Sequence, residues 1–420
     1  MAERRTRRKQ RIEKEEATRI DAVLGAPATD HQREALSQRA GEAVRSGDNT
    51  LARALEAALR HRGRVERATH GFHTYPAGLN PDAARDLVAL GSGPVLDPFC
   101  GGGTVLIEAL LAGRDALGLD VSPIANLVAR ARTARTTEEE RTTMRATARR
   151  ATEVALAART TPTVPEELVR WYEPHALTEL ATIRETIGKE ALLRAVFSAI
   201  LIKASRRESD TSSARTGEKR PPGTAGVLFH KKAREFGRML EALAEAAPVG
   251  ARARVHREDA RELRERGGFG LVVTSPPYPG VYDYMTMQHL RLLWLGLDEG
   301  IDTHEEIGSR RQFRADRAAA LHAWRGDNRK WMKAAARALD TGGRLIVVIG
   351  DGQVSGKRID TYEAMEDAAR AAGLVRIARA TVERWDEGVN AMRPEHATLW
   401  EKPVEAPAPV GDKAEGDKAE

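Results

Sequence analysis

The feature that most constrains the fold is a strand, a glycine-rich turn, a helix and a second strand, which follow one another over residues 93–120. The apolar run PVLD ends at Pro98, three glycines follow at 101–103, TVLIEALLAG has the composition of a buried helix, and DALGLD is a second apolar strand. This order predicts one βαβ unit of a parallel sheet. The glycines allow a ligand to approach the backbone closely where the helix presents its free N–H groups.

The same alternation of strands and helices resumes nearer the C-terminus. Strands are predicted at 255–260, 269–278 and in GGRLIVVIGD, helices at about 286–296, 314–339 and 361–372, and an antiparallel hairpin from VRIARATVERW and HATLWEKP. We therefore predict an α/β, Rossmann-like fold with a mixed seven-stranded sheet, in which five strands are parallel and two antiparallel.

Composition changes along the chain divide it into expected segments. A charged disordered tail is expected at 1–22, followed by an N-terminal helical segment at 23–65 with apolar periodicity over 30–62. A catalytic domain is expected at 66–135 and 250–402, and an Arg-rich helical insertion, the candidate DNA-recognition region, at 136–249. A disordered acidic tail is expected at 403–420. A short helix is also predicted at about 81–90, before the first strand.

Composition also excludes several classes of protein. With one cysteine, Cys100, the chain forms no intramolecular disulfide and no cysteine-rich metal site, and its histidines lack HxxxH or HExxH spacing, so no metal is expected. No run approaches the roughly 18 apolar residues of a spanning helix, and the basic N-terminus lacks the apolar core of a secretory signal, so a cytoplasmic location is expected. The net charge of +6 permits a nucleic-acid partner without requiring one.

Three acidic residues follow three successive predicted strands. Asp97 and Asp120 end the two strands of the βαβ unit, and Asp259 ends the third strand. A dinucleotide is the common ligand of such a glycine-rich turn, but a carboxylate at Asp97 would repel its pyrophosphate, and the glycine spacing is not GxGxxG. S-adenosylmethionine suits the acids better because it carries an ammonium and a sulfonium. Taken singly, each aspartate is better explained as a cap or turn residue, but three of them at successive strand ends beside the three glycines indicate a nucleoside site at the carboxyl edge of the sheet.

A second motif, TSPPY at 274–278, follows the buried run LVV. Two consecutive prolines at the end of a central strand forfeit sheet hydrogen bonds and stiffen the chain. The hydroxyl of Ser275 and the carbonyl of Pro276 could accept both hydrogens of an exocyclic amine, and Tyr278 offers a flat face to a flipped base. The alternative for this motif is a Ser-Pro-Pro turn with a core tyrosine.

Together, DPFCGGGT and TSPPY resemble the DNA methyltransferases that modify amino groups, at N4 of cytosine or N6 of adenine. Serine as the first residue of SPPY resembles the cytosine-N4 subgroup. HGFHTYPAGLNP at 70–81 resembles the family segment that packs over the methionine part of the cofactor, and GVYDYMTMQHLRLLWLG and GGRLIVVIGDG also resemble family segments. The resemblance covers the catalytic domain and leaves the helical insertion unmatched.

The resemblance implies S-adenosylmethionine as the cofactor and double-stranded DNA as the partner. No association with a membrane is expected. The implied reaction is methyl transfer to the N4 amine of a flipped cytosine. The implied catalytic residues are Ser275, Pro276, Pro277 and Tyr278. The implied cofactor-binding residues are His73, Tyr75, Pro76, Asp97, Phe99, Gly101, Gly103, Thr104, Asp120, Asp259 and Ala260.

Three alternatives stay open at this point: an adenine-N6 DNA enzyme, an enzyme acting on an exocyclic amine of RNA, and a non-catalytic nucleic-acid-binding protein that kept the fold. The basic loop at 203–220 is predicted to lie beside the SPPY turn and to contact phosphates, and a solvated loop is its alternative. The contacting residues would be Arg206, Arg207, Lys219 and Arg220. The sequence leaves open the recognition sequence, the oligomeric state and a restriction endonuclease partner.

Overall fold

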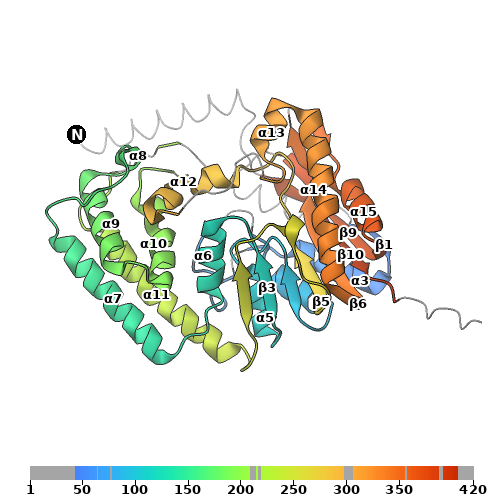
Figure 1. The fold of residues 1–420 in the computed structure, drawn as a ribbon, viewed down its shortest axis with the longest axis horizontal. Coiled ribbons are helices and arrows are strands. Elements are labelled where there is room, and N and C mark those ends of the chain that lie inside the picture. Colours follow the sequence, from blue (N-terminus) through green and yellow to red (C-terminus); the bar gives the residue numbers. More distant parts are fainter. Residues whose placement is uncertain are drawn as a thin grey trace, which may run out of the picture.

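A mixed eight-stranded sheet forms the centre of the molecule (Figure 1). The structure is a computed structural model that describes residues 43–63, 65–75, 78–208, 214–215, 219–297, 306–354, 357–386 and 391–404. The strands of the sheet are β1 (Val44–Gly47), β2 (Val95–Asp97), β3 (Ala116–Leu119), β4 (Ala253–His256), β5 (Phe269–Thr274), β6 (Leu339–Gly350), β9 (Val375–Asp386) and β10 (Ala391–Glu401). A separate ribbon pairs β7 (Gly352–Val354) with β8 (Lys357–Ile359).

The strand order is β1-β9-β10-β6-β5-β2-β3-β4. Strands β2 to β6 pair in parallel, and β10 lies antiparallel between β6 and β9. The predicted Rossmann-like fold, its five parallel strands and its C-terminal hairpin are thus confirmed. The chain leaves β2 to build β3 and β4 on one side and returns to build β5 and β6 on the other. The β2–β5 junction is therefore the topological switch point, where open α/β sheets bind ligands.

Helices cover both faces of this sheet. Alternate residues of β6 point to opposite cores: Leu345 and Val347 pack with α14 (Arg317–Ala338) and α15 (Thr361–Ala371), whereas Ile346 and Val348 pack with α3 (Asn49–Arg60) and α4 (Pro81–Val88). The helices are α3 (Asn49–Arg60), α4 (Pro81–Val88), α5 (Thr104–Leu111), α6 (Pro123–Arg132), α12 (Tyr284–Leu295), α13 (Arg310–Ala315), α14 (Arg317–Ala338) and α15 (Thr361–Ala371), with a 3₁₀ turn η1 (Ala260–Glu262). Among the described helices, none is both long and apolar enough to cross a bilayer.

The eighth strand corrects the predicted count of seven. Residues 43–62 were expected to be helical, but β1 pairs antiparallel with β9 before α3 begins. The reason is local: Gly47 has a φ of +83°, and a Cβ there would lie 2.1 Å from the carbonyl oxygen of Ile377. Asp48 then caps α3, its side chain accepting the N–H of Leu51 at 2.8 Å. The expected tail at 1–22, residues 23–42 of the expected helical segment, and residues 405–420 of the tail expected at 403–420 lie outside the described residues.

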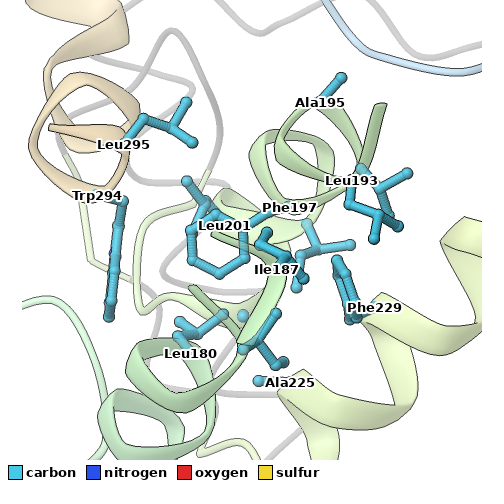
Figure 2. Packing of buried hydrophobic residues seen from close by; sticks show 14 of the residues in the cluster. Leu180, Ile187, Leu193, Ala195, Phe197, Leu201, Ala225, Phe229, Trp294 and Leu295 are labelled. Atoms are coloured by element: carbon cyan, nitrogen blue, oxygen red, sulfur yellow. The ribbon is translucent and has the colours of Figure 1, made fainter. Parts of the chain in front are cut away.

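The described residues of 136–249 form five helices. They are α7 (Glu138–Ala157), α8 (Glu166–Val169), α9 (Pro174–Ile187), α10 (Ala191–Ala204) and α11 (Thr224–Ala246). Figure 2 shows that Leu180, Phe197 and Phe229 of these helices pack into one cluster with Trp294 of α12. Phe72, in the segment between α3 and α4, stacks on Phe236 of α11 with ring centroids 3.6 Å apart. The helical insertion therefore shares its core with segments that border the SPPY motif and the 70–81 segment.

A buried carboxylate fixes the start of α11. Gly223 precedes the helix with a φ of +88°, and its N–H is 2.6 Å from Oε1 of Glu179 on α9. The other oxygen, Oε2, accepts the N–H of Gly226 at 3.0 Å. A negative charge at a helix N-terminus also complements the helix dipole. Glu179 thereby joins α9 to α11 and caps the longest helix of the insertion.

Replacing Glu179 should weaken the insertion measurably. Glu179→Ala removes two charge-assisted hydrogen bonds and leaves the half-buried N–H of Gly223 and the buried N–H of Gly226 unsatisfied, so the free energy of unfolding should fall by about 1–3 kcal/mol. Urea denaturation followed by circular dichroism measures the change. Glu185→Ala on the exposed face of the same helix is the matched control and should change stability by less than about 0.5 kcal/mol. Equal losses in both variants would contradict the cap.

Candidate cofactor and substrate site

The carboxyl ends of the parallel strands surround a cavity of about 120 Å³. Its lining brings together residues that lie far apart in the sequence but at neighbouring strand ends. Of the predicted cofactor-binding and catalytic residues, the lining includes Tyr75, Asp97, Phe99, Gly101, Thr104, Asp120, Asp259, Ala260, Ser275 and Pro277. The cavity therefore sits at the topological switch point of the sheet.

Asp97 links the two strands on either side of that switch point. Its Oδ1 accepts the hydroxyl of Thr274, at the end of β5, at 2.7 Å, and the N–H of Phe99 at 3.2 Å. Burial raises the pKa of Asp97 to about 7, and the nearby charge of Asp120 adds to this rise. The carboxyl group is thus held in a place where ionisation is costly unless a cation accompanies it.

Asp120 holds the glycine-rich loop against the end of β3. Its Oδ2 accepts the N–H of Gly101 at 3.0 Å, and its Oδ1 accepts the N–H of Ser122 at 2.8 Å. Burial raises its pKa to about 6 although these two hydrogen bonds lower it. Gly101 has a φ of +47°, and a Cβ there would come within 3.3 Å of the Tyr75 ring. The loop thus needs glycine both for its conformation and for the close approach of Tyr75.

Asp259 is engaged more fully than the sequence suggested. Both of its carboxylate oxygens accept from the guanidinium of Arg261, at distances from 2.6 to 3.0 Å. Arg261 also pairs with Asp327 of α14 at 3.0 Å. Asp259 lies beyond the end of β4 and caps η1, so it lines the cavity beside Ala260 as part of a charged network.

The predicted segment over the cofactor divides into two parts. Tyr75 lines the cavity, and burial raises the pKa of its hydroxyl. His73 is not among the residues lining this cavity; its Nε2 is 3.0 Å from the hydroxyl of Ser198 on α10, and burial lowers its pKa. Pro76 lies outside the described residues. Among the described residues of the segment, Tyr75 therefore has the position expected of a cofactor contact.

Sequence analysis missed the side chain that secures this segment. Arg132, at the end of α6, is buried, and its guanidinium donates to the carbonyls of Thr69, His70 and Gly102, the last at 2.6 Å. Burial lowers the pKa of Arg132 to about 10. The signal available in the sequence was a pair of arginines, Arg130 and Arg132, in the last turn of α6, which is also a common helix ending.

A larger groove of about 880 Å³ adjoins the cavity and is lined by Ser275 and Tyr278 of the SPPY motif. Ser275 lines both spaces, whereas Tyr278 lines the groove alone. Pro276 is buried and is not part of either lining. The carbonyl of Pro277 accepts the indole N–H of Trp324 at 3.4 Å, which braces the turn from α14. Ser275 is therefore the motif residue at the junction of cavity and groove.

The Tyr278 ring is fixed by its surroundings. Its hydroxyl donates to Glu395 Oε1 on β10 at 3.1 Å, and Glu395 in turn pairs with Arg384 of β9. A Cβ at Gly350 would lie 2.8 Å from Cε2 of this ring, so the absence of a side chain there makes room for the tyrosine. Sequence analysis did not single out Glu395 or Arg384, because each contacts the motif only through the folded hairpin.

Two arginines of the basic loop after α10 contact other parts of the protein. Arg206 forms an ion pair with Glu173, with Nη2 and Oε1 2.6 Å apart. Arg207 is buried, and its Nη1 donates to the carbonyl of Met287 on α12 at 3.3 Å. Both side chains thus attach the loop to neighbouring helices, and Arg207 reaches the helix that follows the SPPY turn. Lys219 is exposed and Arg220 half-buried, and residues 209–213 and 216–218 lie outside the described residues.

Comparison with known proteins agrees with the site geometry. Residues 71–159 match the family model of the RMKL-like methyltransferase domain (UPF0020). The match agrees with the prediction of a methyltransferase that uses S-adenosylmethionine; it continues past residue 135 into the predicted insertion, so the predicted domain bounds stay a prediction. The type II methyltransferase M.MvaI of Kocuria varians is 34% identical over 71 residues, a stretch that spans 16% of this chain and 16% of that protein.

Solved structures include two similar chains. TrmN from Thermus thermophilus is 12% identical over 84% of this chain and 53% of its own length, with a TM-score of 0.30. A putative DNA modification methylase, also from Thermus thermophilus, is 19% identical over 37% of this chain and 56% of its own, with a TM-score of 0.24.

The two raised carboxyl pKa values predict a pH dependence. The folded protein binds more protons at Asp97 and Asp120 than the unfolded chain does between about pH 4 and 7, so these groups stabilise the fold less as pH rises through that range. A cationic ligand favours the ionised carboxylates. We therefore expect the increase in melting temperature caused by S-adenosylmethionine to be larger at about pH 8 than at about pH 5.5.

Asp97→Asn provides the control for this measurement. The amide cannot ionise but retains an acceptor for Thr274, so the pH dependence of the cofactor-induced shift should shrink, and the shift itself should be smaller than in the wild type. An equal shift at both pH values in the wild type would contradict the assignment of these carboxylates to a cationic ligand.

Proposed function

We propose that this protein transfers a methyl group from S-adenosylmethionine to an exocyclic amine of double-stranded DNA, the N4 amine of cytosine. The observation that carries this proposal is the position of Ser275, which lines both the carboxylate-rich cavity and the larger groove. A donor in the cavity and an amine in the groove would meet at this side chain. The 71-residue similarity to M.MvaI also supports a DNA substrate.

The residues of the cavity fit the proposed cofactor. Asp97 is buried and Asp120 half-buried, both have raised pKa values, and a ligand bearing an ammonium and a sulfonium would compensate their charge. Gly101 lines the cavity with a φ of +47°, whereas Gly103, which has a φ of +81°, lies outside the lining and packs against Ala129 of α6. When bound, S-adenosylmethionine supplies an electrophilic methyl group on its sulfonium.

The chain's own residues would orient the amine and exclude water. Ser275 would accept one amine hydrogen, which keeps the nitrogen lone pair directed toward the cavity. Tyr278, fixed by Glu395 and Gly350, would give the flipped base a flat surface. The rate gain expected from such a site comes mainly from alignment and desolvation of the reacting groups.

The direct test is to identify the modified nucleoside. The protein is expressed in a host free of amino-methylated DNA, and the host's DNA and RNA are digested separately for mass spectrometry. The proposal predicts N4-methylcytosine in the DNA. N6-methyladenine in DNA, or a methylated amine in RNA, would overturn the assigned base or nucleic acid. Absence of any methylated amine, with the protein folded and binding the cofactor, would favour a non-catalytic nucleic-acid-binding protein.

Two substitutions separate catalysis from cofactor binding. Ser275→Ala and Tyr278→Ala should each lower turnover by about two to three orders of magnitude, because each removes a contact to the base in the transition state. Their dissociation constants for S-adenosylmethionine, measured by calorimetry, should change little. Wild-type turnover in Ser275→Ala would remove the mechanism proposed here.

Glu395 is a positioning residue in this proposal, and its role is tested by two variants. Glu395→Leu removes the acceptor of the Tyr278 hydroxyl, so kcat/KM for DNA should fall about tenfold while cofactor affinity stays unchanged. Glu395→Gln keeps a carbonyl acceptor and should recover most of the loss. Glu383→Gln, at an exposed position on the neighbouring strand, is the control. Failure of Gln to outperform Leu would argue for a purely structural role.

A further inference from the structure

A basic groove lies between the two long helices of the insertion. One part of it, of about 630 Å³, runs between α7 and α11, and an adjoining part of about 310 Å³ shares Thr152, His230 and Arg234 with it. Its lining includes five cations from the two helices: Arg145, Arg149, Lys231, Arg234 and Arg238. This α7–α11 groove is distinct from the cavity and groove around Ser275, with which it shares no lining residue.

Most of these charges are not neutralised by the protein. Glu153 is the acidic residue in the lining, and it pairs with Arg149 at 2.8 Å. The other four cations have no carboxylate partner in the part of the chain that the structure describes. Arg145 donates instead to the hydroxyl of Thr142 at 3.2 Å. The groove therefore keeps a net positive charge facing solvent.

Several residues of α7 and α11 along this groove lower the stability of their own helices. Arg145 and Arg149 are four residues apart on α7, as Arg234 and Arg238 are on α11, and like charges at this spacing destabilise a helix. Gly237 costs α11 about 1 kcal/mol relative to alanine. A Cβ at Gly237 would lie 3.1 Å from Nη1 of Arg145, so the glycine makes room for that guanidinium between the helices. Residues that disfavour the local helix in this way are often found at functional surfaces.

We propose that the α7–α11 groove binds the phosphodiester backbone of the nucleic-acid duplex that flanks the target base. Arginine is the preferred side chain for phosphate because its planar fork donates two hydrogen bonds. Cations four residues apart on a helix are separated by about 6 Å, close to the roughly 7 Å axial rise of two nucleotides. This assignment of the duplex rests on the proposed function, whereas the affinity for phosphates does not.

The groove's place in the molecule defines what it should affect. Figure 1 shows α7 and α11 at the left, beyond α6, and α14 at the right of the sheet. The groove lies apart from the SPPY motif, so it should contact flanking DNA and leave the chemistry at the target base unchanged. Its contribution should therefore appear with long duplexes and vanish with short ones.

The test compares the salt dependence of duplex binding in a charge-removing variant. Arg234→Gln/Arg238→Gln should lower the slope of log K against log salt by about 1.8, or 0.9 per lost phosphate contact. Between 50 and 200 mM salt, the wild-type affinity for a long random-sequence duplex should therefore fall about tenfold more than that of the variant. For a duplex of about one helical turn, the two proteins should behave alike.

Arg325→Gln/Arg329→Gln is the matched control, since it removes the same charge at the same spacing from the exposed face of α14. An unchanged slope in the groove variant, or an equal change in the control, would overturn the groove as a phosphate site. Binding of an acidic polypeptide in preference to duplex would overturn the partner. The nucleoside analysis reports separately on the proposed methylation, because it does not depend on the salt slope.

Discussion

Two aspartates, the buried Asp97 and the half-buried Asp120, hold the edge of the sheet where the proposed chemistry takes place. Asp97 joins β2 to β5 through the Thr274 hydroxyl, and Asp120 joins the glycine-rich loop to the end of β3 through the Gly101 N–H. Each acid thus sets the spacing between elements that meet at the switch point. Because burial raises both pKa values, ionisation of the two carboxyl groups is costly unless a cation binds beside them.

The helices of the insertion contact this edge of the sheet through side-chain packing. Phe72 stacks on Phe236, and His73 contacts Ser198, so two helices of the insertion hold the segment that contains Tyr75. Trp294 of α12 packs in the same cluster, one helix after the SPPY turn. The insertion therefore orders both the wall of the cavity and the approach to the groove, and this gives it a structural role besides any contact with nucleic acid.

Sequence alone predicted the parts of the site that depend on local pattern. The glycines, Asp97 and Asp120 follow strands whose apolar runs are easily recognised, and parallel strands bring their ends to one edge. It did not predict partners supplied by distant elements: Glu395 lies 117 residues from Tyr278, and Ser198 lies 125 residues from His73. Strand β1 was missed because helical periodicity continues through it, and only Gly47 and Asp48 mark the break. Arg206 and Arg207 were predicted to contact phosphates because of their charge. Charge alone does not reveal that Arg206 pairs with Glu173 or that Arg207 is buried.

The central claim is that the Asp97–Asp120 cavity selects a cationic nucleoside over a dinucleotide. Calorimetric titration of the purified protein with S-adenosylmethionine, alone and in the presence of excess NAD, tests it most directly. The account predicts saturable binding of S-adenosylmethionine that NAD does not displace, with an affinity about tenfold or more weaker in Asp120→Ala. Tighter binding of NAD, or unaltered S-adenosylmethionine affinity in that variant, would contradict it.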